Sequence, residues 1–201
     1  MADLLAKLGL DKLERALLYG IILAAVLAVL TGSIPKSFID SAWIAFFLRL
    51  LHVLAGVMWI GLLWYFNFVQ IPSMPKIPDE QKPAVSKVIA PTALFWFRWA
   101  ALATVVTGVL LALANGYLVD ALLLKSGATR LIGIGMWLGL IMAFNVWFII
   151  WPNQQKALGL VDASADEKKA AARIAMLTSR FNTMFSIPML YFMVGAQNLG
   201  G

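Results

Sequence analysis

AWIAFFLRLLHVLAGVMWIGLLWYFNFV, residues 42–69, is the stretch that decides the fold. It contains no acidic side chain, and its basic side chains are Arg49 and His52. A hydrocarbon core of about 30 Å requires roughly 20 predominantly apolar residues in a helix, and this stretch is longer. Because backbone groups in lipid must be hydrogen-bonded within the segment, the stretch predicts a transmembrane α-helix.

The rest of the chain has the same character. Of its 201 residues, 62% are hydrophobic and 13% are charged, and the mean hydropathy is +0.85. Soluble domains carry about 25% charged residues, so the expected surrounding is a lipid bilayer. These features predict an all-α fold, a polytopic transmembrane bundle of about five helices. The expected spans are 16–34, 42–69, 93–114, 131–151 and 174–195.

Residues 16–201 are expected to form a single transmembrane domain. Before it, residues 1–15 place leucines at helical spacing between charged residues, which predicts an amphipathic helix on the membrane surface. Before the last span, Ser164 and Glu167 have the spacing of a capping box, so a helix is expected to begin near Asp166.

Lysine and arginine indicate the orientation of the bundle. They are concentrated in the N-terminal segment and in the loops after the second and fourth spans, whereas the opposite side has Lys36, Lys125 and Arg130. Positively charged loops stay in the cytoplasm. We therefore expect a bacterial inner-membrane protein with a cytoplasmic N-terminus and a periplasmic C-terminus. The same pattern accounts for the net charge of +6 without nucleic-acid binding.

The absence of cysteine and the single histidine exclude several kinds of site. Disulfides, iron–sulfur clusters, a thiolate nucleophile and c-type haem attachment all require cysteine. A haem held between two histidines of this chain is excluded as well. His52 is a candidate axial ligand for the iron of a haem b, with Arg49 close to a propionate. The alternative for His52 is a hydrogen bond to a carbonyl oxygen on the next helix.

The second and fourth spans share a pattern. MWIGL at residues 58–62 is followed by Asn67, and MWLGL at residues 136–140 is followed at the same spacing by Asn145. Each span precedes a helix with an early arginine beside an aromatic residue. We interpret this as a parallel repeat of helix pairs, the second and third spans forming one copy and the fourth and fifth the other. Such repeats tend to place a functional site at their interface. The alternative is coincidence within a limited apolar alphabet.

Polar side chains within apolar spans usually face the interior of a bundle and mark function. The repeated arginines and several amides are expected at a similar depth in the membrane. Two guanidinium groups with several amides suit a planar anion that has both donors and acceptors. Alternatively, the arginines reach lipid headgroups and the asparagines join helices. The candidate substrate-binding residues are Arg98, Arg180, Asn67, Asn145, Asn153 and Asn182.

Several short motifs resemble the membrane domain of bacterial urate hydroxylases (the PuuD type, with a urate oxidase N-terminal domain). The resemblance extends from about residue 43 to the C-terminus. No C-x-x-C-H motif follows the last span, so the resemblance is to a short form without the cytochrome c domain of that family. The motifs are RLLHVLAGVMWIG at 49–61, YFN at 65–67, WFRW at 96–99, WPNQQK at 151–156 and SRFN at 179–182.

The resemblance implies a membrane oxidoreductase that oxidises urate to 5-hydroxyisourate and passes electrons to a separate cytochrome c. It also implies that Arg98, Arg180, Asn67 and Asn153 hold urate and that His52 is the haem or electron-path residue. Two other functions remain open. One is a non-catalytic accessory subunit packed in a larger respiratory or photosynthetic membrane complex, and the other is a small transporter of an organic anion.

Overall fold

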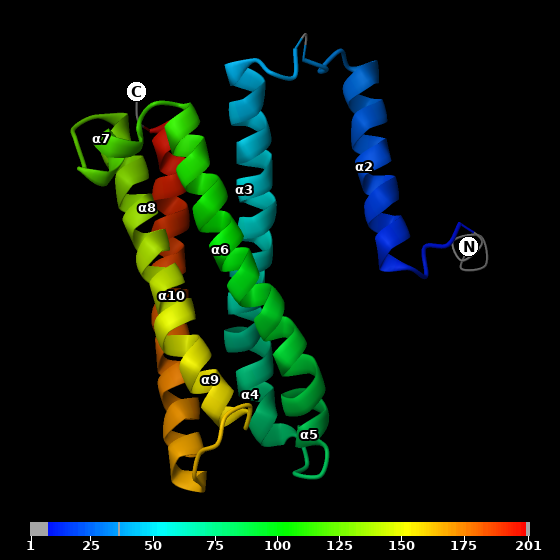
Figure 1. Cartoon of the computed structure of the whole chain (residues 1–201), viewed down its shortest axis with the longest axis vertical. Helices are drawn as coiled ribbons and strands as arrows, with labels where there is room; N and C mark the ends of the chain where they lie inside the picture. Colours follow the sequence, from blue (N-terminus) through cyan, green and yellow to red (C-terminus); the bar gives the residue numbers. More distant parts are fainter. Residues whose placement is uncertain (1–7, 36, 200–201) are drawn as a thin grey trace. The chain divides into compact units, whose positions relative to one another are not determined.

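The computed structural model describes residues 8–35 and 37–199, and all regular structure in these ranges is helical. This confirms the prediction of an all-α fold. The chain divides into two units, residues 1–43 and residues 44–201 (Figure 1). Each unit is described by itself.

The first unit contains α2 (Leu13–Leu30), an apolar helix without a buried residue. It ends sooner than the predicted span 16–34. Gly32 adopts a left-handed conformation with φ of +67° just beyond its end, which is a common way to stop a helix. Residues 8–12 form turns and a bend. Residues 1–7 lie outside the described residues, so the surface helix over 1–15 stays a prediction.

The second unit contains the remaining spans. In the first, α3 (Ser41–Trp64) continues through the π-helical η1 (Tyr65–Gln70), α4 (Ile71–Ser73) and the 3₁₀-helical η2 (Met74–Lys76). In the next, α5 (Lys82–Ala84) and the π-helical η3 (Val85–Ile89) lead into α6 (Ala90–Ala114). The short α7 (Leu118–Leu122) is followed by α8 (Ala128–Phe144), the π-helical η4 (Asn145–Ile150) and α9 (Trp151–Ala157), and the last helix is α10 (Ala165–Asn198).

Four helical stretches of the described residues are long and apolar enough to cross a membrane: Leu13–Leu30, Ser41–Lys76, Lys82–Ala114 and Thr129–Ala157. The fifth predicted span, 174–195, lies within α10, whose average hydropathy is lowered by polar side chains. Those at Ser179, Asn182 and Ser186 are buried, whereas the exposed positions between them are mostly apolar. A polar interior with an apolar exterior is the distribution expected for a helix in a membrane bundle.

The beginning of α10 follows the capping-box prediction. The Ser164 side chain accepts a hydrogen bond from the Glu167 backbone N–H, and the Glu167 carboxylate accepts one from the Ser164 backbone N–H at 2.7 Å. The backbone and side-chain hydrogen bonds with Ser164 lower the pKa of Glu167. The carboxylate therefore stabilises the first turn of α10 in its ionised form.

Prolines account for the π-helical segments. Each of the three in the described residues ends two residues before a proline, which is Pro72 after η1, Pro91 after η3 and Pro152 after η4. Proline lacks a backbone N–H, and its ring clashes with the carbonyl group four residues earlier. A π-helical turn widens the helix at that point, and such turns occur frequently at functional sites.

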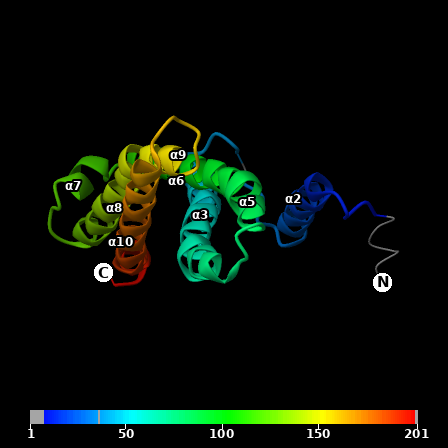
Figure 2. The ribbon, with the colours of Figure 1, turned by 90° about the horizontal axis from the view of Figure 1, so that it is seen from below.

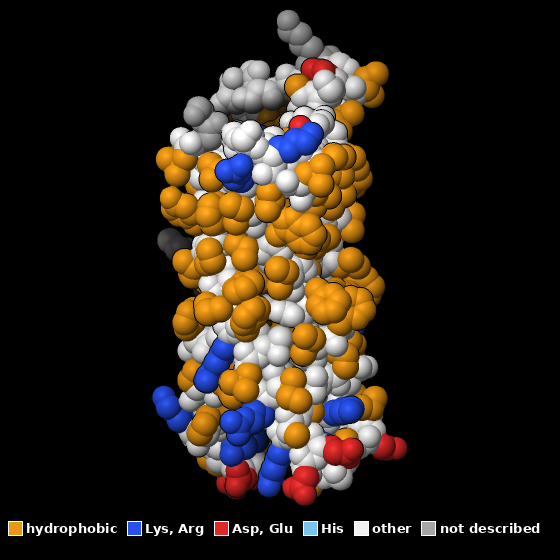
Figure 3. All heavy atoms as spheres, turned by 90° about the vertical axis from the view of Figure 1, so that its left-hand side faces the viewer, with side chains coloured by type: hydrophobic (Ala, Val, Ile, Leu, Met, Phe, Trp, Pro, Cys, Tyr) orange, Lys and Arg blue, Asp and Glu red, His pale blue; other side chains and the backbone are white. Residues whose placement is uncertain are grey.

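The buried core lies in the half of the second unit nearer α4 and α9. Within α3, the buried residues are Trp59, Ile60 and Leu63, all in its last two turns. They pack with residues of α6, α8, η4 and α10 in one apolar cluster. α10 packs along α8 and α9, as Figure 2 shows from the α4–α9 end. The face drawn in Figure 3 has a broad apolar band with charged side chains toward both ends.

Candidate functional site

Three buried polar side chains of α10 face the bundle interior, and we call them the α10 polar face. They are Ser179, Asn182 and Ser186, whose exposed fractions are 6%, 0% and 0%. Positions three and four residues apart share one side of a helix, so the three side chains form a row. Buried polar groups must find hydrogen-bond partners, and those of α10 find them on two neighbouring helices.

The η4 side of this row is closed by hydrogen bonds. The Asn145 side-chain N–H donates to the Asn182 Oδ1 at 2.8 Å, and the Asn182 Nδ2 donates to the Met142 carbonyl oxygen at 2.9 Å. Both asparagines are buried. This chain joins α8 and η4 to α10, which is a common role of asparagine between membrane helices.

The η1 side is less complete. The Asn67 Nδ2 donates to the Ser179 Oγ at 2.8 Å and to the Leu63 carbonyl oxygen at 2.9 Å. The Trp64 indole N–H donates to the Ser186 Oγ at 3.0 Å. The Asn67 Oδ1 and the Gln70 Oε1 are buried, and neither has a hydrogen-bond partner among the described residues. These two oxygens are free acceptors beside the α10 polar face.

A cavity of about 160 Å³ lies at this place, between η1, α6, α9 and α10. We call it the η1–α10 cavity. Its polar lining comes from Gln70, Gln154 and Ser179, and its apolar walls include Phe66 and Phe97. The rings of these two phenylalanines meet edge to face, with centroids 5.6 Å apart. The cavity therefore combines a few amide and hydroxyl groups with flat apolar walls, as small-molecule sites commonly do.

The predicted arginines do not line this cavity. The Arg98 guanidinium lies over the Trp151 ring, with its central carbon 3.7 Å from the centroid, in a cation–π contact. The Arg180 side chain is exposed, although its neighbour Ser179 is buried. The Asn153 Nδ2 donates to the Ile149 carbonyl oxygen of its own helix. The structure thus brings together Asn145 with Asn182 and places Asn67 near the cavity, while Arg98, Arg180 and Asn153 stand apart from it.

His52 forms the hydrogen bond that was the alternative to haem ligation. Its Nδ1 lies 2.8 Å from the Thr104 carbonyl oxygen of α6. With the proton on Nδ1, the ring donates this bond and keeps the Nε2 lone pair free, which is the arrangement typical of metal-ligating histidines. A Cβ at Gly108 would lie 2.9 Å from the ring, so the imidazole packs closely on α6. In that form, His52 has one ring nitrogen left to serve as an axial ligand, and haem binding itself stays a prediction.

Arg49 is exposed one turn from His52. Its positive charge influences the pKa of Tyr117, which lies just before α7. Burial raises the pKa of Tyr117, and the positive charge of Arg49 partly offsets this effect. No group of three or more histidine, aspartate or glutamate side chains among the described residues is arranged to hold a metal ion.

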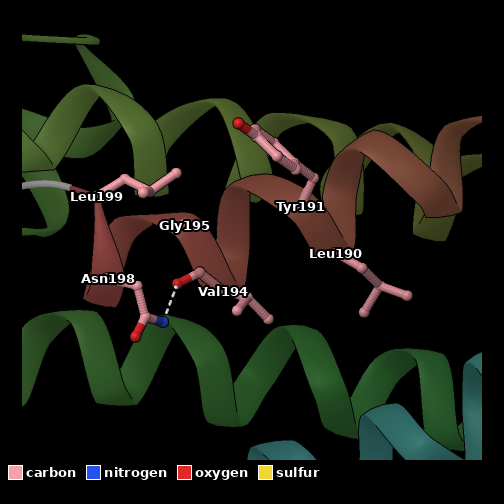
Figure 4. A pocket seen from close by; sticks show the side chains of 6 residues that line it. All are labelled: Leu190, Tyr191, Val194, Gly195, Asn198 and Leu199. Atoms are coloured by element: carbon pink, nitrogen blue, oxygen red, sulfur yellow. Dashed lines mark hydrogen bonds between the residues drawn. The ribbon is translucent and has the colours of Figure 1, made fainter.

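A larger hollow of about 450 Å³ lies near the C-terminal end of α10. Figure 4 shows the residues that line it, five from α10 and Leu199, which directly follows that helix. They include Leu190, Val194 and Asn198, and the Asn198 amide donates to the Val194 carbonyl oxygen of the same helix. A hollow whose lining surface is almost entirely apolar, and whose walls come from one helix end, resembles a lipid-facing surface, so the smaller η1–α10 cavity is the better candidate site.

Sequence reasoning missed three residues of this site. Ser179 and Ser186 were not singled out, although they share a helix face with Asn182 and that spacing is visible in the sequence. Gln70 gave a weaker signal, because a glutamine near the end of an apolar span is commonly solvated. Its burial depends on how η1 meets α6 and α10.

The comparisons with known proteins bear on the C-terminal part of the chain. The family model described as urate oxidase N-terminal matches residues 120–198, which include α8, η4, α9 and α10. Over this segment the match confirms the resemblance to the urate hydroxylase membrane domain. Neither a curated protein nor a solved structure matches the chain.

Proposed function

We propose that this chain is a membrane oxidoreductase that oxidises urate or a related purine and passes electrons to a separate cytochrome. The observation that supports this best is that the matched segment 120–198 contains the α10 polar face and its partner Asn145. Of these residues, Ser179 lines the η1–α10 cavity. The cavity offers amides, a hydroxyl and aromatic walls to a small planar ligand.

The proposed reaction converts urate and water to 5-hydroxyisourate, two protons and two electrons. The new C–O bond takes its oxygen from water, and two oxidised cytochromes each accept one electron. A haem b would supply a one-electron step between substrate and cytochrome. The His52 Nε2 would hold its iron, while the bond from Nδ1 to Thr104 fixes the ring.

The orientation is part of the proposal. The α4–α9 end of the second unit, with its basic loops, would face the cytoplasm of a bacterial cell, and the end near α7 would face the periplasm. Urate would then enter from the cytoplasmic side, and His52 would lie on the side of a periplasmic cytochrome.

The test is turnover by the purified protein in lipid nanodiscs, with urate as substrate and oxidised cytochrome c as acceptor. We expect urate loss coupled to cytochrome reduction, and a Soret band that disappears in His52→Ala. Asn198→Ala serves as the control, because Asn198 is exposed and bonds only within α10. A colourless protein that leaves urate unchanged would refute the oxidoreductase.

The second candidate function is a non-catalytic subunit of a larger membrane complex. The observation that favours it is α2, an apolar helix that has no buried residue within its own unit. Purification from native membranes distinguishes the two functions. A constant stoichiometry with other integral membrane proteins, together with no urate turnover, would support the subunit.

A further inference from the structure

The first half of α10 carries a row of basic side chains on one side of the helix, and we call it the α10 basic stripe. It consists of Lys169, Arg173 and Arg180, all of which are exposed. With 3.6 residues per turn, positions four, seven and eleven residues apart fall within about 40° around the helix axis. The stripe therefore follows one face of α10 over a length of about 16 Å.

These three cations have no counter-ion among the described residues. Both ion pairs in the part of the chain that the structure describes lie in other elements. The Glu167 carboxylate accepts from the Ser164 backbone instead, and Asp166 forms no ion pair with Lys169, three residues further on. Like charges four residues apart on a helix repel each other, as Lys169 and Arg173 do. A row of cations of this kind attracts an anion from outside the chain.

The position of the stripe along α10 corresponds to the edge of the hydrocarbon core of a membrane. After Arg180, residues 181–201 contain no lysine, arginine, aspartate or glutamate. A helix needs about 20 predominantly apolar residues to cross the hydrocarbon core, so Arg180 stands where that core begins. Arg173 lies about 10 Å further along the axis, on the side away from the core. Lipid phosphate groups occupy this zone between hydrocarbon and water.

Beyond the stripe, the same side of α10 is apolar. Met184, Ile187 and Tyr191 follow Arg180 at intervals of three and four residues, and all three are exposed. At the lower end of Figure 3, lysine and arginine side chains reach closer to the apolar band than aspartate and glutamate side chains do. A phospholipid has the same order of groups, with an anionic phosphate followed by apolar chains. This face of α10 thus matches a lipid molecule in both charge and polarity.

We propose that the α10 basic stripe binds the headgroup of one anionic phospholipid, whose acyl chains lie along the exposed apolar side chains that follow Arg180. The guanidinium groups of Arg173 and Arg180 donate pairs of N–H bonds to phosphate oxygens, a geometry that suits arginine. Lys169 adds a third positive charge at the outer end of the stripe. A lipid is favoured over an acidic protein because Arg180 stands at the edge of the hydrocarbon, where lipid phosphates are present. This inference is independent of the proposed reaction.

The experiment is a titration of the full chain in non-ionic detergent with phosphatidylglycerol and with phosphatidylcholine, read by native mass spectrometry. We expect one phosphatidylglycerol per chain, bound at least about tenfold more tightly than phosphatidylcholine, whose choline cation the stripe repels. Arg173→Gln and Arg180→Gln should each weaken phosphatidylglycerol binding by about fivefold. Lys87→Gln is the matched control, because Lys87 is an exposed cation at the same end of the second unit but belongs to η3.

A second measurement uses the lipids of the native membrane. The wild-type chain and the double variant Arg173→Gln/Arg180→Gln are purified from that membrane, and the lipids that remain bound are extracted and quantified. Anionic phospholipids should be enriched over their share of the membrane in the wild type, and this enrichment should be lost in the double variant. Substitutions at exposed helix positions have small effects on stability, and the melting temperature of each variant checks its fold.

Three outcomes would overturn the inference. The first is equal affinity for the two lipids, and the second is unchanged phosphatidylglycerol binding in the double variant. The third is the same weakening in Lys87→Gln as in Arg180→Gln, which would mean that net charge alone attracts the lipid. An acidic protein that co-purifies with the wild type but not with the double variant, while neither binds phosphatidylglycerol, would assign the stripe to a protein partner instead.

Discussion

Asn67 of η1 and Asn145 of η4 stand at the same distance from matching Met-Trp-x-Gly motifs, and both donate a hydrogen bond to α10. Asn145 donates to Asn182, whose own amide continues to the Met142 carbonyl oxygen, and the chain of bonds is closed. Asn67 donates to Ser179 and keeps a buried Oδ1 without a partner. After the same motif, Asn145 therefore belongs to a closed set of hydrogen bonds between helices, whereas Asn67 lies beside the η1–α10 cavity.

The position of the π-helical segments accounts for this difference. Asn145 is the first residue of η4, whereas Asn67 is the third residue of η1. The prolines set these positions, since Pro72 follows Asn67 two residues sooner than Pro152 follows Asn145. A small change in register after a shared motif therefore directs equivalent side chains to different surroundings. Two helices that share a motif can therefore place equivalent side chains in different surroundings, whether or not they arose by the predicted duplication, which stays a prediction.

The largest effect on stability is expected from Gly133→Ala, in α8, which leads into η4 and Asn145. A Cβ at Gly133 would press against the Ala121 carbonyl group of α7, so backbone would have to move. We expect destabilisation of about 3 kcal/mol or more. At the matching position, α3 already has Ala55. The measurement is the free energy of unfolding in mixed micelles, and a loss under about 1 kcal/mol would show that α8 and α7 are not closely packed.

Asn182→Leu should have the next largest effect. It removes both bonds of a fully buried amide, leaves the Asn145 side-chain N–H without its partner, and takes from the Met142 carbonyl oxygen one of its two donors, the other being the Asn145 backbone N–H. We expect a loss of about 1–2 kcal/mol, since hydrogen bonds between membrane helices are worth less than their burial suggests. In the double variant with Asn145→Leu, the loss should be smaller than the sum of the single losses. Additive losses would mean that the two amides do not interact.

Asn67→Leu should cost less stability than Asn182→Leu. It removes the bond to Ser179 but also removes a buried acceptor without a partner, so we expect a stability loss below about 1 kcal/mol. The pair of Asn67→Leu and Asn145→Leu is compared by the free energy of unfolding. Equal stability losses would remove the distinction between the two asparagines.

The sequence predicted the membrane bundle well, because long apolar runs in a chain with few charges permit only helices that span lipid. It also located the capping box of α10, since that motif acts between neighbours in the chain. The site was harder. Asn67, Asn145 and Asn182 were found because buried amides are rare in apolar spans, but which of them meet depends on packing between helices distant in sequence. The side chains of Arg98 and Arg180 lie apart from the cavity because a long side chain can reach several surroundings from one backbone position.

Acidification should destabilise the first turn of α10, the helix that follows α8, η4 and α9 in the chain. Because the pKa of Glu167 is lowered in the folded protein, its contribution to stability is present above the usual pKa of glutamate. It is lost as the pH falls through that lowered value. We expect faster hydrogen exchange in the first turn of α10 between about pH 6 and about pH 3. In Glu167→Gln this pH dependence should disappear, and its persistence would assign the effect to another carboxylate.

The smallest effects on stability are expected at positions where α3 and α8 have the same residue and space for an added methyl group. Gly61 and Gly139 occupy the same place in the shared motif, and a Cβ at either would meet nothing within 4 Å. Alanine has a higher helix propensity than glycine, so Gly61→Ala and Gly139→Ala should each change the free energy of unfolding by less than about 1 kcal/mol, in the stabilising direction. Both are measured in detergent and in the native membrane. A variant that is neutral in detergent but loses a co-purifying protein in the native membrane would place a partner helix at that glycine, because nothing described within the second unit meets the added methyl group. That result would favour the accessory subunit over the isolated oxidoreductase.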